Sequence, residues 1–188
     1  MPTVSRIQTE RLVLREFIMD DWFAVHQYGS GPDVMKGLML LVNTEERSRE
    51  FVKEMMAHQV EEPRNRYDLA ITLVATGEII GSASIRLVWP KQREASMGYV
   101  IRKDCWGLGY ATEAGEEILR LGFKVLGAHR VFGTCDTENL GSVRVLEKIG
   151  MSREGIHRQA FWSDAHGSWR DTYYYAILED DWQTRHLP

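Results

Sequence analysis

The spacing of apolar residues divides the chain into segments that favour strands and segments that favour helices. In Arg11–Phe17, charged and apolar residues alternate, which is the period of a half-buried strand. Trp22–Tyr28 follows two aspartates that can cap a helix, and Gly29-Ser30-Gly31-Pro32 would end it. Glu45–Gln59 carries an apolar stripe at helical spacing, and Thr44 before it can act as the cap. The start of the chain therefore predicts one strand and two helices.

Later segments are shorter, apolar and bounded by turn residues, which indicates strands. Tyr67–Val74 and Glu78–Val88 flank Ala75-Thr76-Gly77 and predict a β-hairpin. The same pattern predicts four more strands, at Glu94–Ile101, His129–Thr134, Ser152–Phe161 and Trp169–Leu178. Strands joined partly by hairpins and partly by helices indicate a mixed sheet with helices on its faces, an α/β or α+β fold. The length fits a single domain over residues 1–188.

One stretch, Ser96–Ala114, reads as a strand, a loop with two glycines and the start of a helix. The predicted helix covers Thr112–Leu126, and its apolar residues share one face: Ala114, Ile118, Leu121 and Val125. Gly107 and Gly109 permit backbone conformations that other residues avoid. The first N–H groups of a helix lack partners inside it, so such a loop can bind phosphate or another anion. The alternative is a tight connection without a ligand.

Two sequences around this loop are informative: Trp106-Gly107-Leu108-Gly109-Tyr110-Ala111-Thr112-Glu113-Ala114, and Asn139-Leu140-Gly141-Ser142-Val143-Arg144-Val145-Leu146-Glu147-Lys148-Ile149-Gly150-Met151. They resemble the GNAT superfamily of acyl-CoA-dependent N-acetyltransferases, and within it the RimJ/RimL type. Gly109 and Ala111 match the last two fixed positions of the family's Gln/Arg-x-x-Gly-x-Gly/Ala loop, whereas Trp106 stands where Gln or Arg is usual. Thr9–Arg15 and Gly167–Leu178 also resemble the ends of RimJ/RimL-type proteins.

The resemblance implies the GNAT fold, a mixed and mostly antiparallel central sheet flanked by helices. In that fold the strand ending near Ile101 and the strand starting near His129 splay apart, and acetyl-CoA, the co-substrate, enters the gap. Its pyrophosphate would lie on the loop backbone, and free backbone N–H groups at the splay would polarise the thioester carbonyl. The implied contacts are Val100, Ile101, Trp106, Gly107, Leu108, Gly109, Tyr110, Ala111 and Thr112.

Three residues of the second motif have candidate roles. Asn139 can cap the helix that follows it, and the resemblance adds contact with the CoA pantetheine arm or with the acceptor. Ser142 projects from the first turn, where a serine of RimJ/RimL-type enzymes is thought to protonate the thiolate; the alternative is a helix-start hydroxyl. Lys148 is either a solvated helix lysine or a contact of the CoA 3′-phosphate. Gly150 is placed to end this helix with a left-handed cap.

No residue of the sequence is an obvious general base. Many relatives place a glutamate where this chain has Ser96. Glu94 lies two residues earlier on the same strand, so alternation predicts that both side chains share one face, which should line the cleft. Glu94 is thus the candidate base. The alternatives are an exposed strand carboxylate and an acceptor amine that loses its proton to solvent.

Composition narrows the function classes. The net charge is −4 with interspersed signs, which counts against direct nucleic-acid binding. No apolar run is long enough to span a membrane, and the N-terminus lacks a secretory signal. Cys105 and Cys135 are therefore expected to stay reduced in the cytoplasm. The six histidines have no metal-type spacing, so no metal is predicted. The aromatic residues Trp162, Trp169 and Tyr173–Tyr175 suit core packing or a homodimer interface.

The sequence predicts an acetyl-CoA-dependent N-acetyltransferase in which a primary amine attacks the thioester directly. A protein N-terminus and a small molecule, such as a polyamine, amino acid or drug, are alternative acceptors. The first two helices would form the acceptor side. Cys135 is the residue to check as an acyl carrier. Because Ser96 replaces the usual glutamate, a catalytically weak acyl-CoA sensor is a second function class. A nucleotide-binding module would need a third glycine after Gly107 and Gly109.

Overall fold

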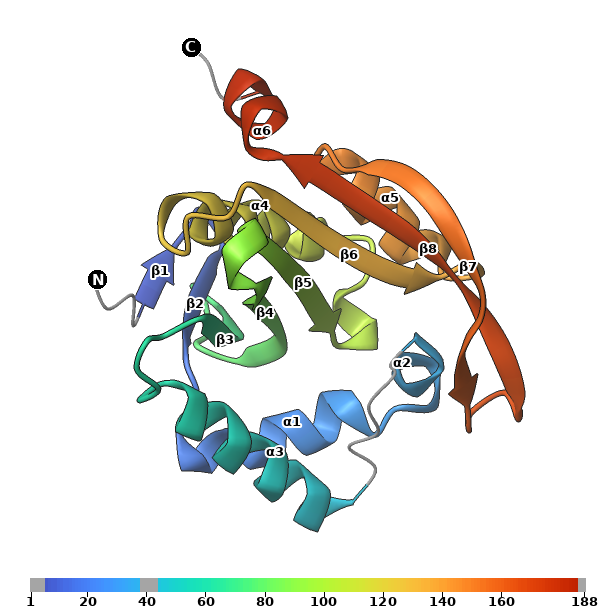
Figure 1. The fold of residues 1–188 in the computed structure, drawn as a ribbon. Coiled ribbons are helices and arrows are strands. Elements are labelled where there is room, and N and C mark those ends of the chain that lie inside the picture. Colours follow the sequence, from blue (N-terminus) through green and yellow to red (C-terminus); the bar gives the residue numbers. More distant parts are fainter. Residues whose placement is uncertain (1–5, 38–43, 186–188) are drawn as a thin grey trace.

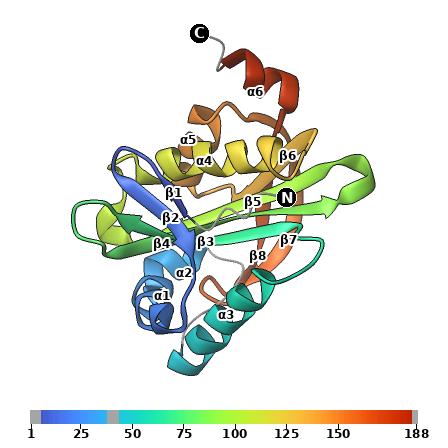
Figure 2. The ribbon, with the colours of Figure 1, turned by 90° about the vertical axis from the view of Figure 1, so that its left-hand side faces the viewer.

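The computed structural model describes residues 6–37 and 44–185, which form an eight-stranded sheet between two layers of helices (Figures 1 and 2). The strands are β1 (Arg6–Gln8), β2 (Leu12–Glu16), β3 (Arg66–Leu73), β4 (Ile79–Trp89), β5 (Glu94–Ile101), β6 (Arg130–Asp136), β7 (Ser152–Ser163) and β8 (Ser168–Leu178). The helices are α1 (Trp22–Gly29), α2 (Pro32–Gly37), α3 (Glu45–His58), α4 (Tyr110–Lys124), α5 (Leu140–Lys148) and α6 (Glu179–Arg185). Single 3-10 turns occupy Met19–Asp21, Pro90–Gln92 and Lys103–Cys105.

The sheet has the order β1-β2-β3-β4-β5-β6-β8-β7. Its paired neighbours are antiparallel except β5 and β6, which run parallel. Figure 2 shows α4 and α5 on one face of the sheet and α1 and α3 on the other. The prediction of a mixed, mostly antiparallel sheet flanked by helices is confirmed.

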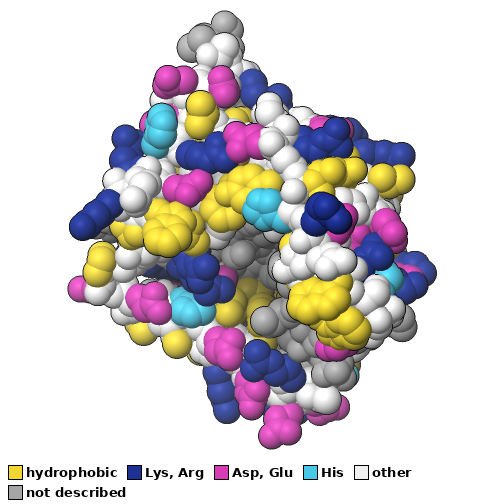
Figure 3. All heavy atoms as spheres, turned by 45° about the vertical axis from the view of Figure 1, so that its right-hand side comes forward, with side chains coloured by type: hydrophobic (Ala, Val, Ile, Leu, Met, Phe, Trp, Pro, Cys, Tyr) yellow, Lys and Arg dark blue, Asp and Glu magenta, His cyan; other side chains and the backbone are white. Residues whose placement is uncertain are grey.

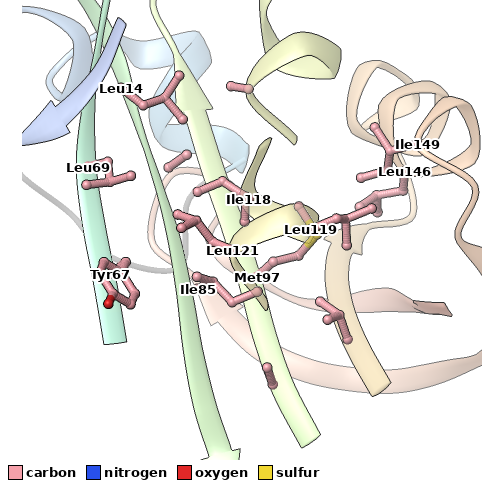
Figure 4. Close-up of a cluster of buried hydrophobic side chains, with 14 of the residues drawn as sticks. Leu14, Tyr67, Leu69, Ile85, Met97, Ile118, Leu119, Leu121, Leu146 and Ile149 are labelled. Atoms are coloured by element: carbon pink, nitrogen blue, oxygen red, sulfur yellow. The ribbon is translucent and has the colours of Figure 1, made fainter. Parts of the chain in front are cut away.

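The larger hydrophobic core lies between the sheet and α4 (Figure 4). Ile118, Leu119 and Leu121 of α4 are fully buried against strand residues such as Ile85. Gly122 allows the close approach, because a Cβ there would lie 2.7 Å from Ile85 Cδ1. On the opposite face a second cluster joins α1 and α3 to the sheet: Phe17, Val25, Tyr28, Val52, Met55 and Ala70. Each layer of helices thus covers one face of the sheet.

Both ends of α4 lie two residues before the predicted ones. α4 begins at Tyr110, two residues before the predicted Thr112, because Gly109 takes a left-handed conformation (φ +85°) and turns the chain into the helix there. It ends at Lys124 rather than Leu126, and Ala128 N donates to Gly122 O beyond the end. The predicted left-handed cap at Gly150 is confirmed, with φ +89°.

Three elements were not predicted: β1, α2 and α6. β1 has only three residues and pairs with β2. α6 places Trp182 against Phe123 of α4, with ring centroids 5.2 Å apart. Both described cysteines are free and buried, and within residues 6–37 and 44–185 no helix is long and apolar enough to cross a membrane.

Candidate active site

The sheet opens at its centre. β5 and β6 pair from Glu94 with Arg130 to Ser96 with Phe132, and no pairing between them is found beyond that point in the described residues. A groove of about 970 Å³ lies on the α4 and α5 side of this splay, and a cavity of about 400 Å³ involves the face that carries α1 and α3. Met97–Val100 and Thr134–Asp136 line both spaces. The two spaces therefore meet where the strands separate, and a splay between these two strands is what the resemblance to the GNAT superfamily implied.

The glycine loop borders the groove. Gly107 and Gly109 both have positive φ values, 76° and 85°, so the loop needs glycine at these positions. The bond from Glu113 N to Gly109 O, 3.1 Å, belongs to the first turn of α4, which leaves the N–H groups of Tyr110–Thr112 before it without helical acceptors. Such donors and the positive end of the helix dipole suit an anion. The geometry fits a pyrophosphate.

Most of the predicted CoA contacts lie in this groove. Its lining includes Val100, Ile101, Trp106, Gly107, Gly109, Tyr110, Ala111, Thr112, Asn139, Ser142 and Lys148. Leu108 is the exception: its side chain is exposed, and it is absent from the lining. The Trp106 indole Nε1–H donates to Ile101 O at 2.6 Å, so Trp106 ties the loop to the end of β5. This bond gives the residue that replaces the usual Gln or Arg a structural role.

A second hydrogen-bonded group lies at the start of α5. Asn139 caps the helix, with its Oδ1 accepting from Ser142 N at 3.0 Å. Ser142 Oγ lies 2.8 Å from the hydroxyl of Tyr99, which comes from β5. Burial raises the pKa of Tyr99 well above its usual value, so this phenol is neutral at physiological pH. The sequence did not indicate Tyr99 as a partner of Ser142, because the two residues lie 43 positions apart.

Cys135 lies at the junction of the two spaces. Burial raises the pKa of its thiol to about 11, with the charges of Asp136 and Glu147 adding to the effect. At physiological pH the group is therefore a protonated thiol, which is a poor nucleophile.

The smaller cavity has an apolar wall and a polar floor. The wall comes from Phe17 and from the two helices over the sheet: Val25, Tyr28, Phe51 and Met55. On the floor, Asp68 of β3 lies opposite Ser84 of β4, and Ser84 lies opposite Gly98 of β5. This row of cross-strand partners leads from a buried carboxylate to the splay.

Both aspartates of the smaller cavity are ion-paired. Arg66 donates to Asp68 at 2.9 Å, and His58 Nδ1 lies 3.1 Å from the same carboxylate. Asp136 accepts two hydrogen bonds from Arg170, at 2.8 and 3.0 Å. Burial alone would raise the pKa of Asp136, but the bonds from Arg170 and from the Glu138 N–H outweigh it and lower the pKa. The carboxylates therefore lie in the cavity as parts of ion pairs.

The expectation that Glu94 and Ser96 line the cleft is not met. Both lie on β5 where it still pairs with β6, and neither belongs to the lining of either space. Glu94 accepts a hydrogen bond from Arg130 at 2.9 Å, and Arg130 also pairs with Glu154. Strand alternation predicted the face correctly, since Gly98 and Val100 of the same face do line the cavity. It could not show where along the strand the sheet opens.

The described residues contain no group of three or more His, Cys, Asp or Glu side chains arranged to hold a metal ion. The face turned forward in Figure 3 is hollowed near its centre, and basic and acidic side chains are interspersed around the hollow.

Comparisons with known proteins agree with this geometry. The sequence profile of the acetyltransferase (GNAT) domain matches residues 11–152. YnaD of Bacillus subtilis (strain 168), named an uncharacterized N-acetyltransferase, is 37% identical over 179 residues, which cover 94% of this chain and 98% of YnaD. A GNAT-family acetyltransferase from Bacillus anthracis has 36% identity and a TM-score of 0.80, over 93% of this chain and 99% of that one.

The structure of Mycobacterium smegmatis RimJ in complex with CoA-disulfide is also similar. Its TM-score is 0.79, and the match covers 90% of this chain and 83% of RimJ. Because the sequence identity is 23%, this likeness supports the fold alone.

Proposed function

The chain belongs to the GNAT acetyltransferase family, and from that premise we propose that it transfers the acetyl group of acetyl-CoA directly to a primary amine. The observation that carries the proposal is the meeting of the groove and the smaller cavity between β5 and β6. A thioester reaching the splay from the groove and an amine reaching it from the other face would be held in contact, which removes much of the entropic barrier.

The groove supports the binding of acetyl-CoA. The N–H groups at the start of α4 would hold the pyrophosphate. The Ile101 N–H, on the edge of β5 that β6 leaves unpaired, would polarise the thioester carbonyl, whereas the register directs the Val100 N–H to β4. Lys148, at the end of α5, lies in the lining and could pair with the 3′-phosphate. Acetyl-CoA supplies the activated acyl group, and these residues orient it.

Direct transfer is favoured over an acyl-cysteine intermediate by the protonated state of Cys135. The amine nitrogen bonds to the carbonyl carbon, the carbon–sulfur bond breaks, and CoA leaves as a thiolate. The amine proton passes to water, because the carboxylates that line the smaller cavity already accept hydrogen bonds from arginines.

Ser142 is the proposed donor of a proton to the leaving thiolate, with Tyr99 controlling the direction of its hydroxyl. Water, which has taken up the amine proton, returns a proton to Ser142, so that one proton in total moves from the amine to the sulfur. Tyr99 has one hydroxyl proton, and it can donate that proton to Ser142 Oγ at 2.8 Å. The Ser142 hydroxyl then accepts from Tyr99 and can donate its own proton to a group in the groove. The bond from Ser142 N to Asn139 holds the same turn in place.

The smaller cavity is the proposed acceptor site, and its chemistry favours a primary amine on an apolar body. Phe51, Met55 and Phe17 offer apolar surface. A polyamine would need carboxylates without cationic partners, whereas Asp68 and Asp136 each carry an arginine. Two sources fit this chemistry: a free aryl- or alkylamine, and a peptide whose N-terminal residue is apolar.

A thiol-release assay tests the proposal directly. Acetyl-CoA is offered with phenethylamine, with peptides starting in an apolar residue, and with spermidine. We expect turnover with the first or second class to exceed that with spermidine. Faster turnover of spermidine would contradict the acceptor assignment. Binding of acetyl-CoA without turnover of any amine would favour the acyl-CoA sensor.

A cytoplasmic location and a homodimer stay predictions. Trp162 and Trp169 near the β7–β8 turn are about half exposed, 50% and 57%, rather than part of the core. Light scattering on the purified protein would test the dimer.

A further inference from the structure

Glu113 presents an electrostatic problem for the proposed pyrophosphate site. It lies in the first turn of α4, directly behind the loop that would hold two phosphate groups. A carboxylate at a helix N-terminus stabilises the helix, but it also lowers the attraction of that terminus for another anion. Glu113 is not part of the groove lining, and its side chain is 16% exposed.

The segment just before β2, residues 9–11, surrounds this carboxylate with hydrogen-bond donors. Thr9 Oγ1 donates to Glu113 Oε1 at 2.5 Å, and the backbone N–H of Arg11 donates to the same oxygen at 2.9 Å. The Arg11 guanidinium donates from Nε to Oε2 at 2.7 Å, and its Nη2 lies 2.7 Å from that oxygen. Burial alone would raise the pKa of Glu113, but these bonds outweigh it and lower the pKa, so the carboxylate is ionised.

Arg11 also holds the loop itself. Its Nη1 donates to the carbonyl of Leu108 at 2.8 Å, and its guanidinium lies 4.8 Å from the ring centre of Tyr110. A Cβ built on Gly109 would lie 3.3 Å from Nη2. The guanidinium therefore contacts Leu108 and Tyr110, and a side chain at Gly109 between them would crowd it. Because the Leu108 carbonyl oxygen is hydrogen-bonded to Arg11, it points toward the arginine and does not face an incoming phosphate.

We infer that Arg11 is a positioning residue for acyl-CoA, because it neutralises Glu113 behind the pyrophosphate loop and fixes the loop backbone for anion binding. This inference rests on the proposed function. It gives a role to the Thr9–Arg15 segment, which resembles the start of RimJ/RimL-type proteins but had no predicted function. It also explains why an acidic residue in this turn is compatible with a phosphate site.

The test measures CoA affinity by calorimetry for the wild type, Arg11→Gln and the double variant Arg11→Gln/Glu113→Gln. Arg11→Gln leaves the Glu113 charge without its cationic partner and is expected to weaken CoA binding by about 2- to 30-fold, the range of charge effects at helix ends. The double variant lacks the Glu113 charge, so its affinity for CoA should return most of the way to the wild-type value. The defect of Arg11→Gln should also shrink as salt is raised, since salt screens the repulsion.

Arg120→Gln is the matched control. Arg120 lies on the same helix and pairs with Glu117 at 2.7 Å, but it does not line the groove. Its loss should leave the affinity for CoA unchanged.

Each outcome has a distinct meaning. A double variant as weak as Arg11→Gln would overturn the charge argument, and wild-type affinity in Arg11→Gln would overturn the inference altogether. If Arg11→Gln does not fold, Arg11→Lys replaces it in both variants. Lysine keeps the charge but lacks the planar fork with which arginine bonds Glu113 and Leu108, so a smaller loss of affinity is expected. A wild-type protein that does not bind CoA would instead refute the proposed function.

Discussion

The glycine loop allows a quantitative test through Gly109→Val. Gly109 has φ +85°, a conformation that is unfavourable for residues with a Cβ and worst for β-branched ones. Its new Cβ would also lie 3.3 Å from Arg11 Nη2, so the arginine must shift by a few tenths of an ångström. The loop is expected to relax toward negative φ, which turns the N–H groups of Tyr110 and Ala111 away from the groove.

The magnitude follows from this strain. The left-handed conformation costs a residue with a Cβ about 1–2 kcal/mol. CoA binding would have to restore the strained loop, so at least this amount is lost from its binding free energy. The dissociation constant should therefore rise by about 5- to 30-fold. Where the strain is retained in the free protein, the same energy lowers the melting temperature by about 2–8 °C for a chain of this size.

Gly77→Val separates the two effects. Gly77 also has a positive φ, +72°, but it lies in the β3–β4 turn, and a Cβ there would meet no atom within 4 Å. We expect Gly77→Val to lower the melting temperature and to leave CoA affinity unchanged. Calorimetry measures the affinity, and thermal unfolding followed by circular dichroism measures the stability. A dissociation constant for Gly109→Val within twofold of wild type would refute the placement of the pyrophosphate.

Four other substitutions test the chemistry. Ser142→Ala should lower turnover by about 10- to 1000-fold with little change in CoA affinity, and Tyr99→Phe should give a smaller loss that disappears in the Ser142→Ala background; wild-type turnover in Ser142→Ala would return this serine to a helix-start role. Cys135→Ala should retain turnover, and loss of turnover in the folded variant would support an acyl-cysteine intermediate. Iodoacetamide should label wild-type Cys135 slowly at pH 8 and faster only as the pH approaches about 11. Glu94→Gln should keep the wild-type pH profile of turnover, because Glu94 pairs with Arg130 outside both spaces; a missing acidic limb would restore Glu94 as the base.

The sequence by itself determined the features that depend on local backbone chemistry. Gly107 and Gly109 permit left-handed conformations in any fold, so the glycine loop could be predicted, although α4 begins at Tyr110, two residues before the predicted Thr112. The same holds for Asn139, whose side chain caps its own helix, and for Gly150 at the end of that helix. The apolar stripe of α4 predicted a buried face, and Ile118 and Leu121 are fully buried.

Other features were decided only when distant segments met. Tyr99 reaches Ser142 across 43 positions, and Arg11 reaches Glu113 across 102, so no spacing in the sequence reports either contact. Asp68 enters the smaller cavity through cross-strand register. Glu94 shows the limit most clearly. Alternation along a strand determines the face of a side chain, but the point where β5 leaves β6 depends on the packing of the whole sheet, and that point lies beyond Glu94.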